Sequence, residues 1–147
     1  MRTSVIYNDR NDDHKDKTRT IYSLLSSLKL YDEIWFIDWN SPKDRGPLLY
    51  NIINEIPHIG KIKHIVIDEK TALSLIQSVG VPYSKNVMIP DPIARNIGIR
   101  RATGDVIFNI SGIDIFGPKL DDFLNMIKNI KPDTFYILSR RELNKEE

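Results

Sequence analysis

The sequence predicts an α/β fold, a three-layer α/β/α sandwich built around a mainly parallel sheet. Short apolar runs of strand length alternate along the chain with stretches that show the i, i+3, i+4, i+7 spacing of amphipathic helices. This alternation is typical of a parallel sheet with helices on both faces. The 147 residues contain no internal repeat, low-complexity tract or linker, so we expect one domain over residues 1–147.

The first half of the chain supplies two predicted strands and two predicted helices. Residues 3–7 are an apolar run that ends in a polar cluster, and residues 33–37 (EIWFI) are a continuous apolar run typical of a strand covered on both faces. A helical pattern follows each run. The apolar positions of these two patterns are Ile21, Leu24, Leu25 and Leu28, then Leu49, Ile52, Ile53 and Ile56.

The second half continues the alternation. We expect a third strand at residues 61–67, a helix after it that ends at Gly80, and a last strand at residues 135–138 (FYIL). The apolar positions of the two helical patterns in this half are Ala72, Leu75, Ile76 and Val79, then Leu120, Phe123, Leu124 and Ile127.

Residues 91–116, DPIARNIGIRRATGDVIFNISGIDIF, are the stretch around which we expect the chain to be organised. Asp91 is a good N-cap and Pro92 suits the first helical position. Gly104 stands where a helix would end in the left-handed conformation, and a buried strand follows it. Asp114, just past that strand, is well placed to bind a metal-bridged phosphate. The other interpretation is a structural helix–strand unit with an aspartate in the next turn.

Composition excludes several classes of protein. The formal net charge is only +1, so no global field favours a nucleic-acid or membrane partner, although a local basic patch stays open. The chain has no cysteine, which excludes disulfides, thiolate zinc sites and a cysteine nucleophile. We find no signal peptide and no apolar run of ~18 residues that could span a bilayer. We therefore expect a soluble, cytoplasmic protein.

Polar residues follow three of the predicted strands, at residues 9–12, 38–40 and 111–114. Ligands of parallel sheets bind beyond the carboxyl ends of the strands, so these tips predict a binding site. The chain has no GxGxxG or GxxxxGK[ST] motif, which argues against a dinucleotide site or a P-loop. It has no GxSxG or SxxK motif for a serine nucleophile, and its three histidines lack metal-ligand spacing.

Three segments together suggest a family. TSVIYNDRN, WFIDWNSP and ARNIGIRRATGDVIFNISGIDIF occur in an order and spacing that resembles nucleotide-sugar glycosyltransferases of the GT-A fold. The likeness is closest to family 2 and to a related group with an RNDDH-like opening. It runs from residue 3 to about residue 116, with a weaker continuation over residues 135–143. ARNIGIRRATGD is the most specific part, because it is similar to the segment that leads into the metal-binding DxD strand.

The resemblance implies roles for individual residues. Asp9 and Arg10 lie where the first strand tip approaches the nucleobase, and Asp38 matches the acidic residue that recognises the base or ribose. Arg95 and Asn96 lie on the helix that frames the nucleotide and its phosphates. Asp114 is the candidate DxD carboxylate, which would hold Mn²⁺ or Mg²⁺ against the diphosphate. Residues 111 and 113 are not acidic, so the DxD motif is degenerate.

Each role has a structural alternative. Arg95, Arg100 and Arg101 can form a solvated helix face, and Asp38 can cap the following turn. Asp9, Asp12 and Asp13 can serve as caps or first-turn charges for the next helix. Trp39 can be a core residue, and Gly98 and Gly104 can serve close packing and the helix C-cap. No general base is assigned, because the chain ends where the family places its acceptor-binding part and Glu142 lies in a charged tail.

Together these observations predict a glycosyltransferase, or its donor-binding half. It would transfer a sugar from a nucleoside diphosphate sugar of the UDP or GDP type to an acceptor hydroxyl. The alternative is a catalytically inactive GT-A-like module that binds a nucleotide or a protein partner. We expect no nucleic-acid partner and no transmembrane segment. The acceptor, the oligomeric state and whether the domain is truncated at its C-terminus stay open.

Overall fold

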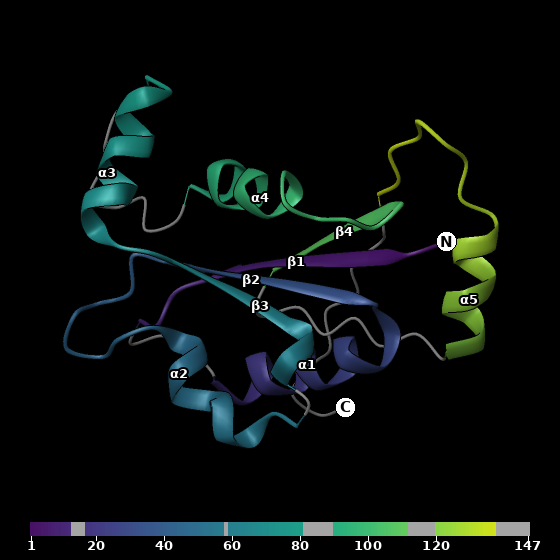
Figure 1. Ribbon diagram of the computed structural model, residues 1–147, viewed down its shortest axis with the longest axis horizontal. Coiled ribbons are helices and arrows are strands. Elements are labelled where there is room, and N and C mark those ends of the chain that lie inside the picture. Colours follow the sequence, from purple (N-terminus) through teal and green to yellow (C-terminus); the bar gives the residue numbers. More distant parts are fainter. Residues whose placement is uncertain (13–16, 58, 81–89, 112–119, 138–147) are drawn as a thin grey trace, which may run out of the picture.

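A computed structural model describes residues 1–12, 17–57, 59–80, 90–111 and 120–137, and Figure 1 shows its elements. The strands are β1 (Thr3–Asp9), β2 (Glu33–Trp39), β3 (Ile62–Ile67) and β4 (Val106–Ser111). The helices are α1 (Lys17–Leu30), α2 (Leu48–Ile52), α3 (Glu69–Ser78), α4 (Asp91–Ile99) and α5 (Leu120–Lys128), with short 3-10 turns η1 (Ile53–Glu55) and η2 (Ile59–Lys61).

The described strands form one four-stranded sheet in the order β3-β2-β1-β4, and every pair is parallel. Helices α1 and α2 lie on one side of this sheet in Figure 1, and α3 and α4 lie on the other. The prediction of an α/β fold with a parallel sheet is confirmed, and the arrangement is compatible with a three-layer α/β/α sandwich.

The alternation of side chains along each strand divides the core in two. On β2, Ile34 and Phe36 point into a cluster with α1, α2 and α5, whereas Ile37 and Trp39 point into a cluster with α3 and α4. Trp39 is almost completely buried, so the interpretation of this residue as core is confirmed. The run at residues 33–37, which we interpreted as a strand covered on both faces, is apolar on both faces for this reason.

The helix of the 91–116 stretch differs from the prediction at both ends. Pro90 holds the N-cap position, and Asp91 is the first helical residue, with its side chain bonded elsewhere. The helix ends at Ile99, five residues before Gly104. Gly104 does not have a positive φ; instead, a Cβ there would lie 2.7 Å from the backbone nitrogen of Ser4. Gly104 is therefore required for close approach of two backbones and not for a helix cap.

The predicted strand at residues 135–138 is wrong over its described part. Phe135, Tyr136 and Ile137 have no regular secondary structure, and the side chains of Phe135 and Ile137 are 85% and 86% exposed. A strand needs a neighbour to take its backbone hydrogen bonds, and none of the described strands pairs with this segment. Leu138 lies outside the described residues.

The chain adds β4 on the opposite side of β1 from β2 and β3. From β1 the chain adds β2 and then β3 on one side, and α4 returns it to the opposite side of β1 for β4. Such a switch point is where parallel sheets bind ligands, at the carboxyl ends of the strands. None of the helices in the described part of the chain has the length and apolar character needed to cross a membrane.

Candidate functional site

The carboxyl ends of β2 and β3 meet in register and create the floor of a cleft. Trp39 pairs with Ile67, and the backbone N–H of Asn40 donates to the carbonyl of Ile67 over 2.6 Å. Asn40 has a φ of 48°, in the left-handed region that asparagine tolerates better than most residues. The chain therefore turns sharply at the tip of β2 and runs away from the sheet.

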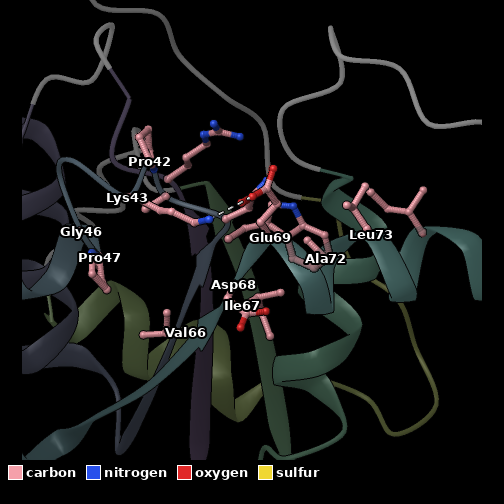
Figure 2. Close-up of a pocket in the computed structure, with 15 residues that line it drawn as sticks. Pro42, Lys43, Gly46, Pro47, Val66, Ile67, Asp68, Glu69, Ala72 and Leu73 are labelled. Carbon is pink, nitrogen blue, oxygen red and sulfur yellow. Dashed lines mark ion pairs between the residues drawn. The ribbon is translucent and has the colours of Figure 1, made fainter.

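The cleft lies between the loop after β2 and the start of α3, and Figure 2 shows the side chains around it. Its volume of about 630 Å³ falls within the roughly 300–1,000 Å³ typical of small-molecule sites. The apolar part of its lining comes from β2, β3, α3 and two prolines: Trp39, Val66, Ile67, Ala72, Leu73, Ile76, Pro42 and Pro47. The charged part comes from Arg10, Lys43, Asp68 and Glu69.

Asp68 has a second task beside lining the cleft, because it caps α3. Its carboxylate accepts the backbone N–H of Thr71 over 2.8 Å. Hydrogen bonds from the side chain and backbone of Thr71 hold the pKa of the Asp68 carboxyl below its ordinary value. One wall of the cleft therefore begins with a fixed helix end that carries negative charge.

The opposite wall, residues 41–47, is held by two residues that lie behind it. The Asp38 carboxylate accepts hydrogen bonds from the hydroxyl of Ser41 and from the backbone N–H of Leu48, the first residue of α2. The side-chain amide of Asn11 donates to the carbonyls of Arg45 and Gly46 over 3.3 and 3.0 Å. Both ends of the loop are thus anchored, so the wall has one shape before any ligand arrives.

The sequence-based prediction did not single out Asn11. It lies within the RNDDH segment, but its contacts are 34 and 35 residues away along the chain. Its backbone N–H also donates to the Ser41 hydroxyl oxygen over 2.9 Å. Its presence in a polar cluster after β1 was the signal that was available.

The two aspartates at the tips of β1 and β2 lie on the opposite face of the sheet from α3. Asp9 and Asp38 pair in register, and both are completely buried. Asp9 accepts the N–H of Arg10 over 2.7 Å and the hydroxyl of Thr20, on α1, over 3.4 Å. Neither aspartate lines the cleft, whereas Arg10 does. The Asp38 contacts are those of the turn cap that we considered as an alternative, whereas the helix cap considered for Asp9 stays a prediction.

His64 approaches Asp38 from β3. Its Nε2 lies 3.7 Å from the Asp38 carboxylate oxygen, and its ring packs edge-on against Phe36 and Tyr50. Only 12% of the His64 side chain is exposed, so this histidine lies largely inside the protein.

A second polar cluster lies at the tip of β1 beside α4. The side-chain amide of Asn8 donates to the Asp91 carboxylate over 2.8 Å. The Arg95 guanidinium donates to the Asp91 carboxylate over 3.1 Å and to the side-chain oxygen Oδ1 of Asn8 over 3.4 Å. Arg95 is only half-buried and Asn96 is exposed. The structure therefore holds the Arg95 guanidinium at the switch point, close to solvent.

The predicted metal ligand Asp114 lies outside the described residues. Over the described ranges, no three histidine, aspartate or glutamate side chains are grouped so that they could hold a metal ion. The nearest buried carboxylates, Asp9 and Asp38, already accept hydrogen bonds.

A contrasting buried carboxylate lies at the amino edge of the sheet. Glu33 accepts hydrogen bonds from Ser4 over 2.6 Å, from Lys63 over 2.5 Å and from the Thr103 N–H over 2.9 Å. Burial alone would raise its pKa, but these donors outweigh burial and lower the pKa of Glu33 to about 2. The Lys63 ammonium also lies 4.9 Å from the centre of the Trp35 ring.

No protein-family model and no curated protein sequence gives a significant match to this chain.

Proposed function

We propose that this protein is a nucleotide-sugar-dependent glycosyltransferase, or the donor-binding half of one. The observation that carries the proposal is the cleft of about 630 Å³ at the carboxyl edge of an all-parallel sheet, where ligands of such sheets bind. The resemblance of ARNIGIRRATGD to the family segment supports it, because α4 carries this segment to the switch point beside β1.

The lining of the cleft suits the nucleoside of the donor. A flat base would lie against the apolar side chains of Leu73 and Ile76, on a floor made by the ends of β2 and β3. Arg10 and Lys43 are the two cations of the lining. Arg95 lies at the neighbouring strand tip, where a guanidinium can form paired bonds to a diphosphate.

The reaction would be transfer of a glycosyl group to an acceptor hydroxyl. The acceptor oxygen forms a bond to the anomeric carbon as the bond to the nucleoside diphosphate breaks, and the diphosphate leaves with the electron pair. The acceptor proton passes to a base outside the assigned residues. Arg10, Lys43 and Arg95 would stabilise the charge that develops on the leaving diphosphate. If the protein follows family 2, the anomeric centre is inverted.

One observation favours the second candidate, a catalytically inactive nucleotide-binding module. Asp9 and Asp38, to which the resemblance gives donor-binding roles, are fully buried, bonded to the scaffold and do not line the cleft. Binding without transfer or hydrolysis of any donor would distinguish this module from the enzyme.

Calorimetric titration with UDP and GDP, each with and without Mn²⁺, tests the proposal. Leu73→Trp fills the cleft and should weaken nucleotide binding at least about tenfold, because the base would lose its site. Ser74→Trp is the matched control, since Ser74 is the exposed next residue of α3 and does not line the cleft. A folded wild-type protein that binds neither nucleotide would refute the proposal.

The dependence on Mn²⁺ tests the predicted metal ligand separately. Binding that requires Mn²⁺ and is weakened by Asp114→Asn would support the role implied by the resemblance. Binding that is independent of Mn²⁺ would keep the nucleotide cleft and remove that role from Asp114. Release of free sugar or transfer to acceptors, followed over a panel of donors, then separates the enzyme from the inactive module.

A further inference from the structure

One ion pair crosses the cleft. Lys43, on the 41–47 wall, places its Nζ 3.5 Å from a carboxylate oxygen of Glu69, the first residue of α3. Both residues line the cleft, and the dashed line in Figure 2 joins them across it. Their side chains are 91% and 60% exposed, so the contact lies on the solvent side.

The backbones on both sides of this pair are fixed. Lys43 belongs to a turn in which the N–H groups of Arg45 and Gly46 donate to the carbonyl of Pro42 over 3.1 and 2.9 Å. Glu69 follows Asp68, which caps α3. Rotation of the two long side chains is therefore enough to break the contact, without movement of either wall.

Such a contact is easily exchanged. Exposed ion pairs contribute little to stability, because water screens the charges and two flexible side chains must be ordered to form them. A phosphate carries more negative charge and more acceptor oxygens than a carboxylate, so it competes well for an ammonium group. An anionic ligand in the cleft can replace Glu69 as the partner of Lys43 at small cost.

We propose that Lys43 binds a phosphate of the nucleotide in this cleft and that Glu69 is its intramolecular competitor. The inference rests on the proposed function, because it takes a nucleotide as the ligand. Glu69 holds the Lys43 ammonium at the mouth of the cleft, and Lys43 must leave Glu69 before it can bind the phosphate. The pair thus sets the affinity for the charged part of the ligand and leaves the nucleoside part unaffected.

Opposite effects of two neutral substitutions test the exchange. In titrations with whichever of UDP and GDP binds, Glu69→Gln should tighten binding about two- to fivefold and Lys43→Gln should weaken it by a similar factor. The double variant should bind as Lys43→Gln does, because Glu69 acts only through Lys43 and direct repulsion is a minor part. All these effects should shrink when about 0.5 M NaCl is added.

The matching nucleoside, uridine or guanosine, is the sharpest probe. It has no phosphate, so its affinity should be the same for the wild type and both variants. Lys70→Gln and Glu55→Gln serve as charge controls, since both residues are exposed and neither lines the cleft. A merely structural role for the pair would change nucleoside and nucleotide binding alike.

Three results would overturn the inference. If Glu69→Gln weakens nucleotide binding, Glu69 contacts the ligand itself. If Lys43→Gln has no effect while the wild type binds, Lys43 does not hold a phosphate, and the proposed function survives alone. If the folded wild type binds no nucleotide, the proposed function and this inference fail together.

Discussion

A buried carboxylate has a different structural role at each of the two edges of the sheet. Strand β2 carries a buried carboxylate near each end, Glu33 at the amino edge and Asp38 at the carboxyl edge. Glu33 takes its hydrogen bonds from β1, from β3 and from the turn before β4, so it ties the strands together. Asp38 takes its bonds from Ser41 and Leu48, so it holds a loop away from the sheet.

The difference shows what marks a site in this molecule. A buried carboxylate bonded to several donors is a structural tie at either edge, and its charge does not point to a ligand. At the amino edge the chains approach so closely that Gly104 has no room for a Cβ beside Ser4. At the carboxyl edge the cleft lies between the anchored loop and α3, and charged side chains line its mouth. Open space bounded by charges marks the candidate site.

Breaking the amino-edge tie should have the largest effect. Glu33→Ala removes the partner of Lys63 and leaves the Ser4 hydroxyl and the Thr103 N–H without their acceptor, so the free energy of unfolding should fall by about 3–5 kcal/mol. Urea denaturation followed by circular dichroism measures it. Glu55→Ala, an exposed glutamate in η1, is the control and should change stability by less than about 0.5 kcal/mol. An equal effect of both substitutions would contradict the role of Glu33 in holding the strands together.

Acid should loosen the same edge. The pKa of Glu33 is about 2 in the folded protein against an ordinary value of 4.5, so its stabilising contribution is complete above about pH 4.5 and is lost as the pH falls towards 2. The loss should amount to about 3 kcal/mol, since one pKa unit corresponds to about 1.4 kcal/mol.

Comparison with Glu33→Gln isolates this contribution from that of other carboxyl groups. The gap in unfolding free energy between wild type and Glu33→Gln should be widest near pH 6 and should narrow steadily below about pH 4.5. A gap that stays constant down to pH 3 would show that Glu33 is not held in its charged form.

Close packing at the amino edge gives a smaller effect, and a second glycine sharpens it. A Cβ on Gly104 would lie 2.7 Å from the Ser4 backbone nitrogen, whereas a Cβ on Gly98 would meet the side chain of Ile6 at 2.4 Å. Side chains can move and a paired strand backbone cannot, so Gly104→Ala should cost about 2–3 kcal/mol and Gly98→Ala about 1–2 kcal/mol. Thermal denaturation ranks the two.

A double-variant test separates the two kinds of clash. Ile6→Ala removes the atoms that a Cβ on Gly98 would meet, so the Ile6→Ala, Gly98→Ala protein should be more stable than the sum of the single effects predicts. Ser4→Ala removes the hydroxyl oxygen at 2.6 Å from a Cβ on Gly104 but leaves the backbone atoms at 2.7 and 2.9 Å, so compensation in the Ser4→Ala, Gly104→Ala protein should be smaller. Equal compensation in both pairs would mean that the β1 backbone yields.

The elements of this fold are encoded locally, and so they could be predicted. The apolar runs that became β1, β2 and β3 and the periodic stretches that became α1, α3 and α5 each carry their own signal. The run at residues 135–138 carries the same signal, but a strand forms only where a neighbouring strand accepts it. Gly104 was misinterpreted because a helix cap and a close backbone contact both favour glycine.

The candidate site was only partly within reach of the sequence. The strand tips were expected to carry it, and Arg10 does line the cleft. The walls were not foreseeable, because Asn11 meets residues 45 and 46 only after the sheet has formed. Side chains alternate along β2, so Trp39 faces α3 whereas the adjacent Asp38 faces α2. Asp38 therefore does not line the cleft. Its predicted contact with a base or ribose stays a prediction.

Asp38→Asn tests that contact and the carboxyl edge together, with an expected loss of stability of only about 1–2 kcal/mol. The amide keeps one acceptor oxygen but cannot accept the Leu48 N–H and the Ser41 hydroxyl as the carboxylate does. Hydrogen exchange of the Leu48 amide should therefore accelerate, and nucleotide binding should weaken because the 41–47 wall is no longer fixed. Glu33→Gln should change neither, despite its larger cost. If Asp38→Asn weakens binding while Leu48 exchange stays slow, Asp38 contacts the ligand itself, and the carboxyl edge is more than a scaffold for the cleft.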